Sequence, residues 1–209
     1  MRICINHKRA ATGPETRPAR QDTVVRDPFY DKVPKFFDMT LKELYSVKHP
    51  TAWIDFEKGQ ICEDALVRNF FQDGRTFNSE GMKRMMIESC HYLKGAQELL
   101  QELAESNIEQ HAMSNYPVWY QHIDAKLQLD RYLQGWTFMS CEGPMKGIRK
   151  PDPRCWDIAQ RHLGVDASQL VLVDDRKENC ESAAAAGLHA IHSTDAASTR
   201  QRLRELLII

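Results

Sequence analysis

The feature that most constrains the fold is a short run at residues 170–173 (LVLV), which is apolar at every position. A strand with one face in water alternates apolar and polar side chains, so an unbroken apolar strand indicates that both faces are buried. Such strands are typical of parallel sheets that carry helices on both faces. We therefore predict an α/β domain with this run in its sheet.

The segments around that run alternate between strand and helix patterns. We predict strands at 107–114, 136–140 and 189–192, and helices at 153–163, 178–186 and 199–207. Gly164 and Gly187 are expected to end the first two helices, since glycine is common where a helix terminates. Strands and helices that alternate at this spacing form βαβ units, so we predict a Rossmann-like parallel sheet.

The chain before the first of these strands has a different pattern. Between residues 27 and about 106, apolar side chains recur every three or four positions, most clearly from Leu93 to Leu103. This spacing is typical of amphipathic helices that bury one face. We predict that the stretch is helical.

The charge balance and the length of the apolar runs limit the partners. Lys and Arg number 28 against 29 Asp and Glu, which excludes a strongly basic surface for nucleic acid. The chain also lacks an apolar run near the roughly 20 residues that a membrane helix needs. Its six cysteines include no Cys-x-x-Cys pair, so reduced thiols rather than a zinc site are expected. We expect a soluble protein that binds neither nucleic acid nor membrane; its oligomeric state stays open.

A first polar cluster, Ser114 and Asn115, follows the strand predicted at 107–114. The hydroxyl, the amide and the backbone N–H groups after them can hold a phosphate oxygen. Taken alone, Ser-Asn-Tyr-Pro is equally typical of an ordinary turn.

A second cluster is the segment 149–153 (RKPDP), which precedes the helix predicted at 153–163. Lys150 lies before a proline and is therefore expected to be extended. A lysine held at this position can neutralise a phosphoryl group as a point charge. Taken alone, a solvated lysine explains the pattern as well.

A third cluster, Asp174 and Asp175, follows the apolar run at 170–173. Two adjacent carboxylates at the end of a buried strand repel each other and need a cation, and oxygen ligands suit Mg²⁺. The alternative is that Asp175 caps the next helix. Ligands of open α/β sheets bind at the carboxyl ends of the strands, so the three clusters together predict a phosphate-and-magnesium site.

The order Ser, Lys and paired acids resembles motifs II, III and IV of the haloacid dehalogenase (HAD) superfamily, over about residues 22–193. The most specific parts of the match are 149–153, Asp174, Asp175, Asn179, Ala183 and Gly187. More narrowly, the plant and algal members that include plastid FMN hydrolases are similar at 27–30 (DPFY), 114–120 (SNYPVWY) and 136–140 (WTFMS).

The resemblance implies roles for individual residues. Ser114 would bond the transferred phosphoryl oxygen, with Asn115 as a further phosphate ligand. Lys150 would stabilise the charge on the phosphoryl group and on the nucleophile. Asp174 and Asp175 would hold Mg²⁺, directly or through water. The expected catalytic residues are therefore Ser114, Lys150, Asp174 and Asp175.

The resemblance also implies an activity, namely Mg²⁺-dependent hydrolysis of a small phosphate monoester such as FMN through an aspartyl-phosphate. The implied partner is a small phosphorylated metabolite, and the implied compartment is the chloroplast, with the cytoplasm as the alternative. The expected organisation is an atypical segment at 1–21, a core at 22–29 and 91–209, and a small α-helical (C1-type) cap at 30–90. In the cap, Trp53, Phe56 and Glu57 are candidates for the substrate side, although buried packing explains the two aromatic residues equally well.

The resemblance fails at the first motif of the family, a buried strand that runs into Asp-x-Asp-x-Thr. Thr23 fits the last position, and counting back four and two residues reaches Ala19 and Gln21. A methyl group cannot attack phosphorus, and an amide does not release a proton near neutral pH. Asp22 and Asp27 are poor substitutes, because neither has the second acid or follows an apolar strand.

The strand of that motif is not visible in the sequence either. Residues 12–20 (TGPETRPAR) contain two prolines and no large apolar residue, which excludes a central strand. We therefore expect the first central strand to be missing or atypical and residues 1–21 to be disordered, or alternatively part of a targeting peptide. A further alternative places the strand at residues 3–5, where it would end at Asn6, which is no nucleophile.

Two hypotheses stay open. In the first, the chain is a phosphatase whose N-terminus is wrong or alternative, and an upstream reading frame encodes a strand that ends in Asp. In the second, it is a degenerate, non-catalytic member that binds a phosphorylated ligand. The presence of Lys150, Asp174 and Asp175 favours the first, since a protein without the chemistry need not keep them.

Overall fold

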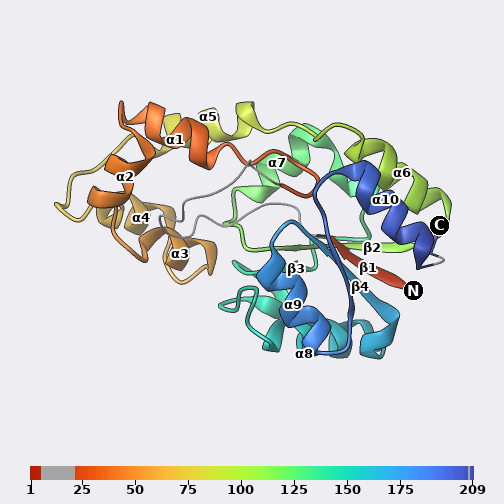
Figure 1. The fold of residues 1–209 in the computed structure, drawn as a ribbon. Helices are drawn as coiled ribbons and strands as arrows, with labels where there is room; N and C mark the ends of the chain where they lie inside the picture. The colour runs from red at the N-terminus through yellow and green to blue at the C-terminus, as the bar shows by residue number, and fades with distance from the viewer. Residues whose placement is uncertain (6–21, 207) are drawn as a thin grey trace.

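The computed structural model describes residues 1–5, 22–206 and 208–209, and this part of the chain contains a five-stranded sheet (Figure 1). The strand order is β3 (Phe138–Met139), β2 (Glu109–Ser114), β1 (Arg2–Ile5), β4 (Leu170–Asp174) and β5 (His189–His192). All neighbouring strands are parallel. The predicted Rossmann-like parallel sheet is therefore confirmed.

The strand in the middle of the sheet comes from the N-terminus of the chain. Ile5 lies opposite Ala112 of β2 and Val173 of β4. Of the expectation that the central strand is missing or atypical, the first half was therefore wrong, because the strand is present at an atypical distance before Thr23. The expectation of disorder was likewise wrong for residues 1–5, and the alternative that placed the strand at 3–5 is confirmed. Without β1, the backbone groups of both neighbours would be buried without partners.

The reason for that error is the distance along the chain. Seventeen residues separate Ile5 from Thr23, whereas the family pattern places the strand directly before its threonine. Ala19, Gln21 and the rest of 6–21 lie outside the described residues, so the expectations for these positions stay predictions.

Helices cover both faces of the sheet (Figure 1): α6 (Ala96–Glu105) and α10 (Ala196–Glu205) lie on one face, and α8 (Arg154–Leu163) and α9 (Lys177–Ala185) on the other. The side chains of β1 alternate between the two faces. Ile3 and Ile5 belong to the hydrophobic cluster that includes α6 and α10, and Cys4 belongs to the cluster that includes α8 and α9. The two clusters hold the carboxyl ends of the strands in place.

Local signals set the ends of these helices. Gly164 ends α8 with φ 63°, and Gly187 follows α9 with φ 88°, so both predicted stops are confirmed. Helix α10 begins earlier than expected because the Asp195 side chain accepts a hydrogen bond from the Ser198 N–H at 2.8 Å. An N-cap of this kind satisfies a backbone donor that the helix itself leaves unpaired.

A second group of helices lies beside the sheet in Figure 1: α1 (Phe29–Phe36), α2 (Leu41–Val47), α3 (Ala52–Glu57), α4 (Glu63–Asn69) and α5 (Ser79–Ser89). Thr40 and Glu43 form a capping box that starts α2. These helices occupy the stretch where a cap is expected, and its boundaries at residues 30 and 90 stay a prediction.

A further helix, α7 (Tyr120–Leu127), follows β2, and three short 3₁₀ turns lie at Leu129–Arg131, Gly143–Met145 and Ala167–Gln169. Among the described residues, every helix is too short or too polar to span a membrane.

Candidate functional site

The Lys150 side chain lies at the carboxyl edge of the sheet. Its Nζ donates to the carbonyl oxygen of Met113, at the end of β2, at 2.7 Å. It also forms an ion pair with Asp174 Oδ2, at the end of β4, at 2.6 Å. Because β1 lies between β2 and β4, the ammonium group spans the end of the central strand. Lys150 is 1% exposed, so the solvated lysine that the sequence also allowed is wrong.

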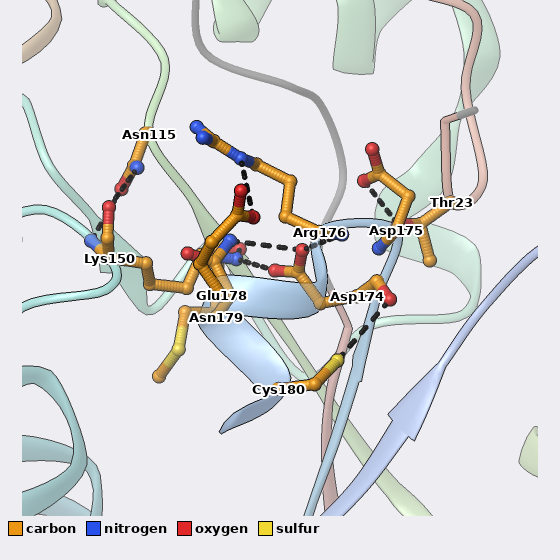
Figure 2. A network of polar contacts seen from close by, with 10 residues as sticks. Thr23, Asn115, Lys150, Asp174, Asp175, Arg176, Glu178, Asn179 and Cys180 are labelled. Atoms are coloured by element: carbon orange, nitrogen blue, oxygen red, sulfur yellow. Dashed lines mark hydrogen bonds and ion pairs between the residues drawn. The ribbon is translucent and has the colours of Figure 1, made fainter. Parts of the chain in front are cut away.

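The backbone of Lys150 is held by Asn115. The Lys150 N–H donates to Asn115 Oδ1 at 2.9 Å, and Asn115 Nδ2 donates to the Lys150 carbonyl at 2.9 Å (Figure 2). This reciprocal pair anchors the loop before α8 to the residue that follows β2. The phosphate contact expected of Asn115 stays a prediction, and its amide already serves to position Lys150.

Asp174 is fully buried at the end of β4 and accepts hydrogen bonds on both oxygens. Besides the Lys150 ammonium on Oδ2, Oδ1 accepts from the Arg176 N–H at 2.8 Å and from Asn179 Nδ2 at 2.9 Å (Figure 2). A buried carboxylate is tolerated only when it is paired and hydrogen-bonded, and Asp174 meets both conditions. Its orientation is therefore fixed before any ligand arrives.

Asp175 is held by Thr23, the residue that fits the last position of the first motif. The Thr23 hydroxyl donates to Asp175 Oδ1 at 2.9 Å and accepts from the Asp175 N–H at 3.1 Å (Figure 2). The N-cap position of α9 is Arg176, with no side-chain capping bond. The alternative that Asp175 caps this helix is therefore wrong.

Ser114 completes the set of predicted residues at this edge. It is the last residue of β2, is fully buried, and directly follows Met113, whose carbonyl binds Lys150. The structure thus brings Ser114, Lys150, Asp174 and Asp175 together at one end of the sheet. Their individual roles stay predictions.

Two further acids, Asp22 and Asp27, lie on the turn into α1. Asp22 Oδ2 accepts from Arg26 Nη1 at 3.0 Å and from the Asp27 N–H at 3.3 Å, and Asp27 Oδ1 accepts from the Phe29 N–H at 3.0 Å. Burial, together with the Asp27 charge, raises the pKa of Asp22 to about 6. These contacts belong to the turn, so they do not support either residue as a substitute nucleophile.

The acid pair fits the Mg²⁺ ion that the family implies. Residues 1–5, 22–206 and 208–209 contain no group of three or more His, Cys, Asp or Glu placed to hold a metal. Mg²⁺ at phosphate sites, however, is usually held by one or two carboxylates together with phosphate and water. Asp174 and Asp175 supply the carboxylates, and Asn179 Oδ1 is a buried oxygen without a hydrogen-bond partner among the described residues. The donors are all oxygen, as Mg²⁺ prefers.

The cap residues singled out in the sequence are buried. Trp53 and Phe56 are 1% and 3% exposed, and the Trp53 ring lies 4.9 Å from that of Phe29 and 5.7 Å from that of Trp119. Trp53 and Phe56 are therefore packed in the hydrophobic core, as the alternative interpretation of the sequence predicted. Trp119, which comes just before α7, connects this aromatic cluster to the core.

Glu57, at the end of α3, ties the cap to the loop that carries Lys150. Its Oε1 accepts from Trp53 Nε1 at 2.6 Å, and its Oε2 lies 3.3 Å from Arg149 Nη2. The Ser140 hydroxyl donates to the Glu57 carbonyl at 2.6 Å. The sequence analysis named Arg149 and Ser140 only as members of the segments 149–153 and 136–140, because neither has a local signal that points to Glu57.

Comparison with known proteins shows which family the chain belongs to. The model of the haloacid dehalogenase-like hydrolases matches residues 41–187. The chain belongs to this hydrolase family. Flavin mononucleotide hydrolase 1 of Arabidopsis thaliana, named as chloroplastic, is 48% identical over 88% of this chain and 74% of its own length. A sesquiterpene phosphatase of Aspergillus oryzae is 26% identical over 81% of this chain and 86% of that protein.

Solved structures share the fold of this HAD-like hydrolase. A HAD-family enzyme from Bacteroides thetaiotaomicron, in complex with magnesium and inorganic phosphate, aligns with a TM-score of 0.64 and 17% identity, over 91% of this chain and 92% of that chain. An L-2-haloacid dehalogenase from Xanthobacter autotrophicus aligns with a TM-score of 0.58 and 16% identity, over 99% of this chain and 83% of that chain. At these identities the likeness shows the fold alone.

Proposed function

We propose that the carboxyl edge of the sheet binds the phosphoryl group of a small phosphate monoester and that hydrolysis of this ester is its reaction. The observation that carries the proposal is the buried Lys150 ammonium, which spans the ends of β2 and β4 beside Ser114. Lys150 would offset negative charge on the phosphoryl group, and the Ser114 hydroxyl would donate to one of its oxygens. FMN is the first substrate to test, because the Arabidopsis relative is named for its hydrolysis.

Mg²⁺ is the cofactor that we propose for this site. Asp174 and Asp175 would hold the ion, and Asn179 Oδ1, which has no hydrogen-bond partner among the described residues, would accept from a water molecule bound to it. When bound, the ion supplies positive charge that stabilises the phosphoryl oxygens. Lys150 and Asn115 keep Asp174 and the loop before α8 in the orientation that this binding needs.

A specific observation favours a second candidate, binding without turnover. The family nucleophile is an aspartate that follows the first strand, whereas β1 ends at Ile5 and the next residue in the sequence is Asn6. Residues 6–21 contain a single carboxylate, that of Glu15. An amide does not form an acyl-phosphate, so the second candidate predicts retained phosphate affinity and no hydrolysis.

One experiment separates the two candidates. Purified protein is assayed for phosphate release from FMN with and without Mg²⁺, and for FMN and phosphate binding by calorimetry, beside the variant Ser114→Ala. Mg²⁺-dependent release that Ser114→Ala weakens supports hydrolysis. Binding that Ser114→Ala weakens, without release, supports the second candidate. Absence of both binding and release contradicts the proposed function as a whole.

A gain-of-function variant sharpens the result. Asn6→Asp introduces a carboxylate at the sequence position where the family carries its nucleophile, directly after the first strand. If the binding residues are in place and only the nucleophile is lacking, this variant releases phosphate from FMN above the level of the parent protein. The matched control is Asn6→Gln, which keeps an amide and is expected to release none.

We further propose that the protein acts in the chloroplast. The support is the name of the Arabidopsis relative, which is 48% identical. Microscopy of the full gene product fused to a fluorescent protein tests this; a cytoplasmic signal would contradict it.

A further inference from the structure

Arg176 is a partly buried cation at the same edge of the sheet, and the family motifs leave it without a role. It follows Asp175 directly and precedes α9 (Figure 2). We propose that Arg176 is a second cationic ligand of the phosphoryl group and acts beside Lys150. This inference rests on the proposed function of the site.

The backbone of Arg176 places the residue within the site. Its N–H donates to Asp174 Oδ1 at 2.8 Å, the oxygen that Asn179 also contacts. The position of its Cα is therefore fixed relative to the Lys150–Asp174 pair. In Figure 2 the side chain extends away from the end of β4, with its guanidinium group above Glu178 in this view.

The Arg176 side chain is mostly shielded from solvent and weakly paired. The Arg176 side chain is 11% exposed, although arginine is among the residues that are mostly exposed in folded proteins. Its Nε has no hydrogen-bond partner among the described residues. The ion pair recorded for it joins Nε to Glu178 Oε2 at 3.7 Å, and the Glu178 side chain is 54% exposed. A long ion pair with a solvated partner contributes little, so the Arg176 Nε lies in the protein without a close anionic partner among the described residues.

The charges at this edge explain why a second cation is needed. The Lys150 ammonium is already paired with Asp174 at 2.6 Å, so much of its charge is offset within the protein. A phosphate monoester brings up to two negative charges at neutral pH, so a further cationic side chain beside Lys150 and the proposed Mg²⁺ would add to its binding. The planar guanidinium fork matches two phosphate oxygens at once, which an ammonium group cannot do. Arg176 is thus suited to exchange its weak contact with Glu178 for a phosphoryl group.

The test measures the affinity for inorganic phosphate, which contains only the group that Arg176 is proposed to bind. Calorimetry in Mg²⁺ buffer compares the parent protein with Arg176→Ala and Arg176→Lys. We expect Arg176→Ala to raise the Kd about 10- to 100-fold, as loss of a charge-assisted hydrogen bond does, and Arg176→Lys to recover only part of the loss. If Arg176→Ala does not fold, the Arg176→Lys variant is the test. A phosphate Kd of Arg176→Lys equal to that of the parent protein would overturn the proposed role of the guanidinium group.

Two neighbouring residues provide controls. Lys177→Ala removes one positive charge from the next position, where the side chain is 75% exposed and pairs with Glu181, and is expected to change the Kd less than twofold. Glu178→Gln removes the competing carboxylate and is expected to leave binding equal or tighter. An effect of Lys177→Ala as large as that of Arg176→Ala would overturn the proposal, because it would indicate a general field effect.

The outcomes distinguish this inference from the proposed function. If the parent protein binds neither phosphate nor FMN, the proposed function itself fails. If it binds phosphate and Arg176→Ala binds equally well, the role of Arg176 alone fails. If Arg176→Ala weakens FMN but not phosphate, the guanidinium contacts another part of the ligand, and the proposal is likewise overturned.

Discussion

Two consecutive residues, Arg149 and Lys150, form ion pairs of different quality. Lys150 lies 2.6 Å from Asp174 in the core, and both carboxylate oxygens of Asp174 accept hydrogen bonds. Arg149 lies 3.3 Å from Glu57 of the cap, and its Nε and Nη2 lack hydrogen-bond partners among the described residues. The core pair is therefore preorganised, whereas the pair between core and cap is loosely matched. A loosely matched pair opens at a lower free-energy cost than a preorganised one, so we expect the contact between α3 and the Lys150 loop to open first.

The largest expected effect comes from breaking the core pair. Asp174→Ala leaves the Lys150 ammonium buried without its partner, which costs about 3–5 kcal/mol of unfolding free energy. Denaturation in urea, followed by circular dichroism, measures the change. The double variant Asp174→Leu with Lys150→Met is the control, since replacing both partners by apolar side chains should restore much of the loss. A single variant as stable as the parent would show that the pair is solvated rather than buried.

A second prediction concerns the close approach of cap and core at Gly59. A Cβ at this position would lie 2.2 Å from the Cys141 carbonyl oxygen, and φ is +64°. Gly74→Ala is a matched control, because its φ is +75° and nothing lies within 4 Å of a Cβ there. Both variants carry the cost of a left-handed alanine, and Gly59→Ala adds overpacking of about 1–3 kcal/mol. Equal urea midpoints for the two variants would contradict the contact.

A third prediction concerns pH and Asp22, the buried acid on the turn into α1. The pKa of Asp22 is raised to about 6 by burial and the Asp27 charge, so the folded state holds a proton that the unfolded chain releases near pH 4. The contribution of Asp22 to the free energy of unfolding is therefore fully present below about pH 4 and is lost as the pH rises through about 6. Between pH 4 and 8, we expect the free energy of unfolding to fall by roughly 2 kcal/mol less in Asp22→Asn than in the parent protein. Urea unfolding of both proteins across this range checks it; identical pH profiles would contradict it.

The smallest expected effect is at the pair between core and cap. Glu57→Gln keeps an acceptor for the Trp53 indole but removes the charge facing Arg149. Because Arg149 is only loosely paired, we expect a loss of about 1 kcal/mol, with faster hydrogen exchange confined to α3. A loss as large as that of Asp174→Ala would show that the two pairs do not differ, and the comparison above would fail.

Much of the fold and of the site follows from local patterns. The apolar run at 170–173 predicts β4, and Asp174 and Asp175 lie at its end as expected. Gly164 predicts the end of α8, and Ser114 and Lys150 lie at the same edge of the sheet as the acids. Each of these predictions depends on neighbours in the chain or on the rule that parallel strands end at one edge.

The contacts within the site were not predictable in the same way. Nothing around Asn115 indicates that its amide binds the backbone of a residue 35 positions later. The burial of Arg176 and the approach of Glu57 to Arg149 likewise depend on elements that are distant in the sequence. Polar residues carry no periodic pattern, so their partners emerge only when the strands and helices are assembled.

The sequence by itself determined the α/β class, the alternation of strands and helices and the chemistry at three strand ends. The tertiary structure decided that Arg2–Ile5 is the central strand, which the sequence offered only as an alternative because no strand pattern directly precedes Thr23. The physical reason is that a strand of four residues has little pattern of its own. Its place is set by β2 and β4, whose backbone donors and acceptors need a partner between them and accept one from any distance along the chain.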